Sequence, residues 1–80
     1  MLVPLLGFLR GDTIGLVVLV HDHQSVAEVA GAVQEAATVR VAPRARARVY
    51  FKGEVLDPTA TVAASGLSAL DRIDVVQEEE

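Results

Sequence analysis

Cysteine and tryptophan are absent from this sequence, and its only aromatic residues are two phenylalanines and one tyrosine. Without cysteine, the chain has no disulfide framework, no thiolate nucleophile and no cysteine zinc site. Basic residues are also scarce, because seven stand against eleven acidic ones and the net charge is −4. That balance argues against a protein that binds nucleic acid along its whole surface.

Long hydrophobic runs are missing too. The two apolar stretches, 1–9 and 14–20, are separated by Arg10, Gly11 and Asp12, and both are far shorter than the roughly 20 residues of a membrane-spanning helix. The first stretch lacks the basic segment and the small-residue cleavage site of a signal peptide. We therefore expect a cytoplasmic protein that does not bind a membrane.

The fold is indicated by the segment 48–76. Apolar residues make up 51% of the 80-residue chain, which suits a single domain over residues 1–80. A β-rich run at 49–51 precedes a Lys52-Gly53 turn, a short apolar piece, a helical turn from Thr61 and a closing strand at 73–76. This order is typical of the second half of a ubiquitin-like β-grasp domain. We predict an α+β fold in which a mixed four- to five-stranded sheet wraps one main helix.

The first half predicts a hairpin and the main helix. Strands over 3–10 and 13–20 flank Gly11 and Asp12, where the chain should reverse. Ser25 and Glu28 have the spacing of a capping box, so a helix should begin there. Small apolar residues then follow at helical spacing and define a buried stripe: Val26, Val29, Ala30, Val33 and Ala37.

The segment 38–48, here called the arginine arm, is unusual because it carries four of the seven basic residues: Arg40, Arg44, Arg46 and Arg48. One interpretation is a solvated loop that leads into the third strand. The other is a docking arm in which Arg40, Arg44 and Arg46 bind carboxylates of a partner, because arginine forms bidentate pairs with them. Nucleic acid fits less well, since no aromatic residues alternate with these arginines.

A second candidate for partner binding is the face of the sheet that turns away from the helix. If the even-numbered residues from 16 to 20 face the helix, strand alternation turns Val17 and Leu19 outward. The same alternation turns Tyr50 and Val76 outward. Apolar residues on both faces of an edge strand indicate a covered outer face, so we predict a partner surface formed by these four residues.

Catalytic and metal-binding patterns are nearly absent. His21, Asp22 and His23 carry metal-binding groups, but no other histidine or cysteine completes a site, and we favour a solvated loop with Asp22 near the helix start. Ser65 precedes Gly66 in a turn sequence, and no base is paired with it in the pattern of a nucleophile elbow. We predict no catalytic, cofactor-binding or metal-binding residue in this chain.

The sequence ends in three glutamates at 78–80, which we expect to form a frayed tail. Ubiquitin-like modifiers and sulfur carriers end in Gly-Gly, whose carboxylate is adenylated. We therefore do not expect this chain to be a conjugated modifier.

Three segments, taken in order, resemble one protein family. They are Arg40–Arg44 (RVAPR), Thr61–Leu67 (TVAASGL) and Ile73–Glu79 (IDVVQEE). Comparable segments with similar spacing occur in the small (gamma) hydroxylase subunit of bacterial multicomponent toluene and alkene monooxygenases. The resemblance covers nearly the whole chain. The sequence departs from the family pattern at 51–53 and in its alanine-rich helix, which leaves the hydrocarbon substrate open.

The resemblance implies a non-catalytic subunit of a hetero-oligomeric hydroxylase. Its partners would be a medium subunit and a large subunit that holds a carboxylate-bridged di-iron centre, and the complex would use dioxygen and NADH to oxidise a hydrocarbon. This chain would supply no iron ligand, because it lacks the Glu-x-x-His motifs of di-iron sites. The alternative is a free-standing ubiquitin-like module that binds a peptide through the same sheet.

Overall fold

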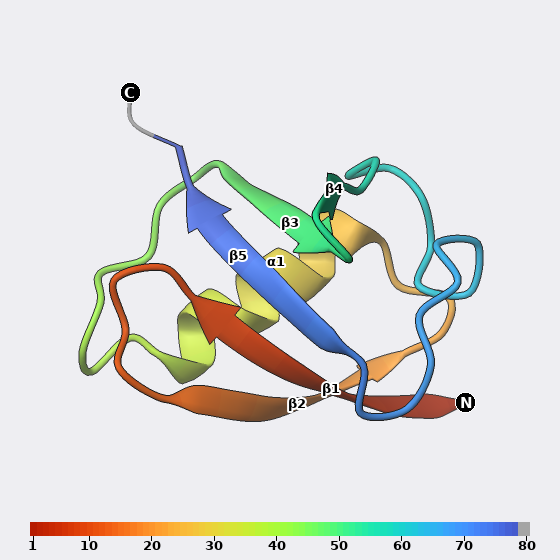
Figure 1. Cartoon of the computed structure of the whole chain (residues 1–80), viewed down its shortest axis with the longest axis horizontal. Helices are drawn as coiled ribbons and strands as arrows, with labels where there is room; N and C mark the ends of the chain where they lie inside the picture. Colours follow the sequence, from red (N-terminus) through yellow and green to blue (C-terminus); the bar gives the residue numbers. More distant parts are fainter. Residues whose placement is uncertain (79–80) are drawn as a thin grey trace.

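A computed structural model describes residues 1–78, so that residues 79–80 of the expected tail lie outside the described part. The elements are β1 (Leu2–Leu9), β2 (Gly15–His21), α1 (Val26–Ala36), β3 (Ala47–Phe51), β4 (Glu54–Val55) and β5 (Arg72–Gln77). The strands form one sheet in the order β2-β1-β5-β3-β4, and α1 crosses one of its faces (Figure 1). Strands β1 and β5 run parallel and the other neighbours antiparallel, so the predicted mixed sheet around one main helix is confirmed.

Helix α1 begins where the capping box predicts. The Ser25 hydroxyl accepts a hydrogen bond from the Glu28 N–H at 3.1 Å, and the Ser25 N–H donates to the Glu28 carboxylate at 3.2 Å. These bonds satisfy N–H groups that a helix N-terminus leaves unpaired, and the bond from the Ser25 backbone lowers the pKa of Glu28. The predicted stripe is confirmed as well, because each of its five residues is at most 3% exposed.

The contact between α1 and β1 depends on a glycine. A Cβ atom on Gly7 would lie 2.8 Å from Cγ2 of Val33, which is closer than nonbonded carbon atoms come. The rest of the core consists mostly of short β-branched side chains, which keep the helix close to the sheet. The buried apolar residues are Val3, Leu5, Leu9, Val18, Val20, Val26, Val29, Ala30, Val33, Ala37, Val49, Val62, Leu67, Ile73 and Val75.

The first hairpin has a longer connection than the sequence predicts. The expected reversal lies at 11–12, whereas the pairing of β1 with β2 stops at Phe8 and Gly15. The Phe8 ring fills the space over Gly15, where a Cβ atom would meet it at 2.7 Å. Arg10, which follows the last residue of β1, donates its N–H to the Val75 carbonyl at 2.9 Å. The chain therefore stays beside β5 for one residue beyond β1 before it loops toward β2.

The second hairpin has the predicted turn. Lys52 and Gly53 join β3 to β4 with φ angles of 52° and 80°, and two successive positive φ angles are the requirement of a type I′ turn. Strand β4 contains only two residues and pairs with the last two residues of β3. Within residues 1–78, Ala47 and Arg48 at the start of β3 therefore have a neighbouring strand on one side only, β5.

We expect Val33→Asp to unfold the chain. Val33 is fully buried, and an unpaired carboxylate there costs several kcal/mol, a large share of the roughly 5–15 kcal/mol that stabilises a domain. Circular dichroism on heating should show no cooperative transition. Ala27→Asp is the matched control, because Ala27 is exposed in the first helical turn, where negative charge is favourable. A Val33→Asp chain that melts at the parent temperature would contradict this packing.

Candidate partner-binding surfaces

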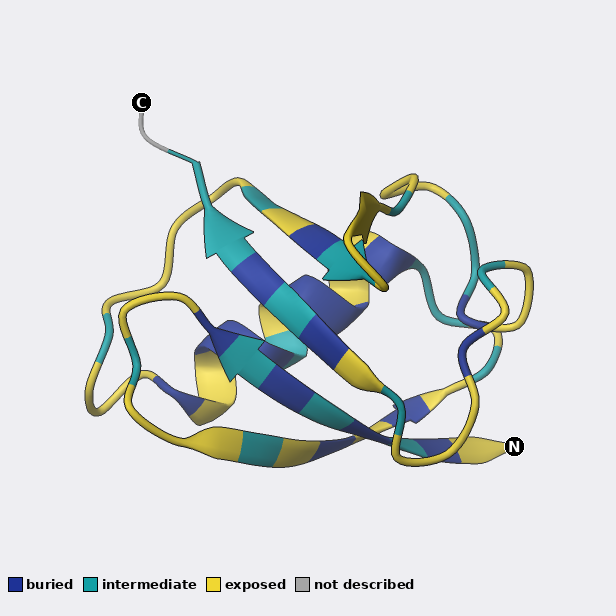
Figure 2. Ribbon diagram, in the orientation of Figure 1, coloured by how far each residue is buried: buried dark blue, intermediate teal, exposed yellow. Residues whose placement is uncertain are grey.

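The outer face of the sheet, opposite α1, is turned toward the viewer in Figure 1. Exposure alternates along β2, as Figure 2 shows. Val17 and Leu19 are 61% and 65% exposed, whereas Val18 and Val20 between and beyond them are buried. The predicted direction of the β2 side chains is therefore confirmed.

Around Val17 and Leu19 the outer face is apolar across two strands. Leu6 pairs with Val17 and Pro4 with Leu19, and Leu2 at the start of β1 is 55% exposed. These five residues form what we call the β1–β2 patch. Its three β1 members were not predicted from the sequence, although alternate residues of β1 show the same apolar pattern as those of β2. An apolar patch over an edge strand favours a protein partner.

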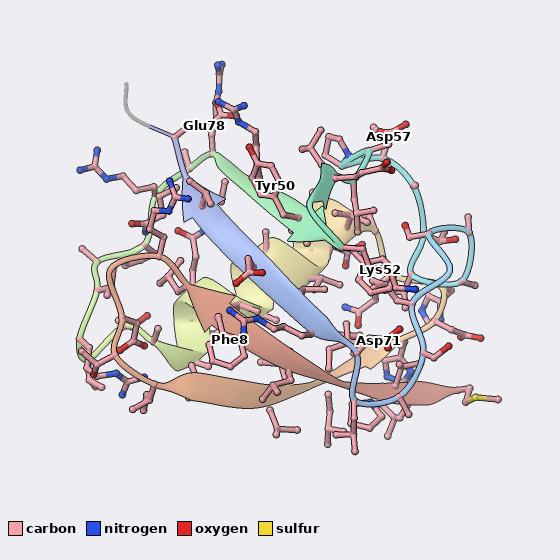
Figure 3. The ribbon with its side chains drawn as sticks, in the orientation of Figure 1. Phe8, Tyr50, Lys52, Asp57, Asp71 and Glu78 are labelled. Carbon is pink, nitrogen blue, oxygen red and sulfur yellow. The ribbon has the colours of Figure 1, made fainter. Side chains whose placement is uncertain are left out.

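Tyr50 and Val76 do not belong to this patch. On β5, Arg72 and Asp74 lie between Tyr50 and the patch, and Arg72 bonds Asp74 at 3.1 Å and lies over the Phe8 ring, 4.1 Å from its centroid. Val76 follows Asp74 in the same row of β5 and pairs with Arg48 of β3. Figure 3 shows Phe8 and Tyr50 on opposite sides of β5. The four predicted residues therefore fall into an apolar half and a half with charged neighbours.

Arg40 is held within the chain. Its Nε and Nη2 atoms donate to the two carboxylate oxygens of Asp12 at 2.8 and 2.9 Å. The Asp12 side chain is only 1% exposed, and the bonds from Arg40 hold its pKa below the ordinary value. The bidentate pairing that the sequence suggests for a partner is thus made by Arg40 with the connection between β1 and β2.

Two glutamines order the backbone of the arginine arm. The buried Gln34 side chain accepts from the Arg44 N–H at 2.8 Å and donates to the Arg44 carbonyl at 3.2 Å. Nε2 of Gln77 donates to Oε1 of Gln34 at 2.8 Å and to the Ala42 carbonyl at 2.7 Å. The arm is therefore tied to both α1 and β5.

Arg44 and Arg46 differ from the other arm arginines. Within residues 1–78 neither lies at ion-pair distance from a carboxylate, whereas Arg48 bonds Glu78 at 2.9 Å. Both line a groove of about 730 Å³ between α1 and β3. The structure thus brings these two arginines together beside a groove and leaves Arg40 apart from them.

The segment 21–23 does not assemble a metal site. Asp22 bonds the N-terminal ammonium group at 3.1 Å, and the rings of His21 and His23 lie with their centroids 5.2 Å apart. Over residues 1–78, no group of three or more histidine, cysteine or acidic side chains gathers in a way that could hold an ion. The same part of the chain contains no helix long and apolar enough to cross a membrane.

A family model described as toluene-4-monooxygenase system protein B (TmoB) matches residues 2–77. The chain belongs to the TmoB family. It is a small subunit of a multicomponent monooxygenase. A chain in the solved toluene 4-monooxygenase HD complex with the inhibitor 4-bromobenzoate is 32% identical, with a TM-score of 0.89 over 98% of this chain and 100% of that chain. Comparison with curated protein sequences gives no match.

More distant relatives of this TmoB-family chain show the fold alone. Caldiarchaeum subterraneum ubiquitin is 17% identical, with a TM-score of 0.77 over 100% of this chain and 98% of that chain. The ubiquitin-like domain of Plasmodium falciparum Dsk2 is 15% identical, with a TM-score of 0.74 over 98% of this chain and 100% of that chain. The predicted ubiquitin-like β-grasp fold is confirmed.

The pair of Asp12 and Arg40 should make the stability of this TmoB-family chain depend on pH. Because folding lowers the pKa of Asp12 below 3.8, its contribution is complete above that pH and is lost as the pH falls through the lower, folded value. Asp12→Asn should therefore melt at a lower temperature than the parent at pH 7, and the difference should shrink in acid. Asp74→Asn, which removes the more exposed pair with Arg72, is the control and should change the melting temperature less. Equal melting temperatures of parent and Asp12→Asn at pH 7 would contradict the role of the pair.

Proposed function

We propose that this chain is the non-catalytic small subunit of a di-iron hydroxylase and that it docks on the large subunit through the β1–β2 patch. The complex would oxidise an aromatic or alkene hydrocarbon with dioxygen and NADH in the cytoplasm, and a medium subunit would complete it. The observation that carries the proposal is the patch itself, which is apolar and lies on the edge strand β2 and its neighbour β1, with Leu2, Val17 and Leu19 exposed. Membership of the TmoB family favours this role over that of a free-standing ubiquitin-like module.

Energetics support the patch as the docking surface. Fully burying a valine or leucine side chain is worth about 1.5–3 kcal/mol, and Leu2, Val17 and Leu19 each expose more than half of theirs. Covering them would also protect the free edge of β2, where unpaired backbone groups otherwise invite aggregation. A partner that covers both the patch and the edge would remove both unfavourable features.

The arginine arm would supply the polar part of the contact. Arg44 and Arg46 would pair with carboxylates of the partner, with Tyr50 and Val76 at the border, while Arg40 holds the arm in place through Asp12. Exposed ion pairs contribute only about 0.2–1 kcal/mol, but breaking a desolvated arginine–carboxylate pair at an interface costs about 2–5 kcal/mol. Arginines on an ordered backbone lose less entropy on binding than arginines on a mobile loop.

We assign the di-iron centre to the large subunit because residues 1–78 of this chain lack a suitable set of metal-ligating side chains. Such centres use carboxylates and histidines that project together from several helices. Residues 1–78 contain one helix, α1, whose acidic side chains are Glu28 and Glu35, and the two histidines lie outside it. These residues do not fit a di-iron centre.

The patch should be tested by co-purification with the large subunit. Val17→Asp combined with Leu19→Asp should abolish co-purification, because two carboxylates would be buried against an apolar surface. The variant should remain folded, since both side chains are exposed. Ala64→Asp is the control, because Ala64 is exposed and lies in the turn after Thr61, outside both the patch and the arginine arm. Undiminished co-purification of the double variant would rule out the patch as the docking surface.

The purified chain alone should show no oxygenase activity and should bind less than one equivalent of iron or zinc. The reason is the lack of a ligand set beyond His21, Asp22 and His23. Elemental analysis and an oxygenase assay with and without the large subunit measure this directly. Close to one equivalent of metal, lost in His21→Ala, would overturn the assignment of the metal to the partner.

A further inference from the structure

The first part of β3 has an open edge. On one side, the Glu78 N–H donates to the Arg46 carbonyl at 2.9 Å, next to β5. On the other side, the Leu56 N–H donates to the Val49 carbonyl at 2.8 Å, after β4. Successive residues of a strand direct their backbone N–H and C=O groups to opposite sides. Because the Arg46 carbonyl faces β5, the N–H and C=O groups of Ala47 point away from β5. Strand β4 pairs only with the last two residues of β3 and does not reach Ala47.

A proline explains why this edge stays open. If the pairing of Val49 with Leu56 continued, residue 58 would come opposite Ala47, and Pro58 has no N–H to donate. Its carbonyl accepts instead from the Ala27 N–H of α1 at 3.0 Å. The segment after β4 therefore leaves the side of β3 and runs to the start of α1. The backbone of Ala47 is left facing the groove.

The groove has room for side chains on its helix side. Its α1 wall includes Ala27, Ala30 and Gly31, and its total volume is about 730 Å³. A Cβ atom on Gly31 would meet no other atom within 4 Å. A small apolar side chain can therefore lie over this wall without displacing the helix.

The rim of the groove is positively charged. Three arginines, Arg44, Arg46 and Arg48, line it against two acidic residues, Asp57 and Glu78. Within residues 1–78 only Arg48 among these arginines has a carboxylate partner, Glu78. Ala47 packs against the core, so alternation turns Arg46 and Arg48 to the outer face of the sheet. In a strand added beside β3, the side chains opposite these arginines would lie about 4.5–5.5 Å from them, Cβ to Cβ.

We propose that an extended acidic segment of a partner polypeptide adds to the open edge of β3 as a further strand. Its carboxylates lie opposite Arg46 and Arg48. The alternate side chains are small and apolar and lie over Ala30 and Gly31. Backbone hydrogen bonds to Ala47 fix the register, and the arginines select the charge. This inference rests on the proposed pairing of the arm with carboxylates and adds to it the groove and the strand edge.

The probe is an acetylated and amidated peptide, Gly-Val-Asp-Val-Glu-Val-Asp-Gly, compared with its Asn/Gln counterpart. The ¹⁵N-labelled full chain is titrated with each peptide and followed by NMR. The acidic peptide should bind with a Kd of about 1 mM or lower and slow hydrogen exchange of the Ala47 amide about tenfold or more. The neutral peptide should bind at least about threefold more weakly, as expected for exposed ion pairs.

Variants separate the groove from the β1–β2 patch. Gly31→Leu should abolish peptide binding and raise the melting temperature, because leucine fills the groove and favours the helix more than glycine does. Arg46→Glu should weaken binding at least about threefold at low salt and less at high salt. The Val17→Asp, Leu19→Asp chain should bind the peptide like the parent, even though it fails to co-purify with the large subunit.

Several results would overturn the inference. They are no binding of the acidic peptide, binding that survives Gly31→Leu, and resonance shifts that appear at the patch but not at Ala47. Equal affinity for both peptides would remove the role of Arg46 and Arg48. The two proposals fail separately. Undiminished co-purification of the Val17→Asp, Leu19→Asp chain would overturn docking through the patch, whereas a parent chain that does not bind the acidic peptide would overturn the added strand.

Discussion

A single helix covers a single face of the sheet, and the other features of this chain follow from that constraint. The valines and alanines of α1 meet the inner face at close range, which Gly7 permits by leaving space for Val33. Every strand except the two-residue β4 buries side chains of one row on the helix side. Within residues 1–78 no element covers the second row, so its side chains contact either solvent or a partner. Apolar residues in that second row are therefore informative about binding.

The features that the sequence predicts correctly depend on neighbours along the chain. The capping box joins Ser25 to Glu28, the buried stripe repeats at helical spacing, and the Lys52-Gly53 turn needs two positive φ angles. The alternation within β2 likewise gives the outward direction of Val17 and Leu19. In each case the interacting residues lie at most a few positions apart, so the pattern can be recognised in a single sequence.

The features that the sequence does not predict depend on the register between distant segments. Arg40 meets Asp12 across 28 positions, and Gln77 meets Gln34 across 43. The division of the outer face also depends on register, because the parallel pairing of β1 with β5 sets Leu6 beside Arg72 and Phe8 beside Asp74. No local pattern specifies which charged residue of β5 lies between the two halves. The long connection after β1 has the same origin, since the Phe8 ring over Gly15 is a contact between strands.

The two edges of the sheet differ in a way that bears on partner choice. The β2 edge carries the apolar Val17 and Leu19, and the open part of the β3 edge carries Arg46 and Arg48. Charged residues on an edge strand prevent pairing with a second copy, because two such edges would bring like charges together. The same charges permit pairing with an acidic strand. The chain as a whole is acidic, but at physiological salt its charges are screened beyond about 8 Å, so the arginines at the edge determine the electrostatics of close contact. Like charges at the open part of the β3 edge therefore oppose pairing with a second copy at that edge, and they are the basis for proposing an acidic partner there. The β2 edge lacks such charges, so its protection depends on a partner that covers it.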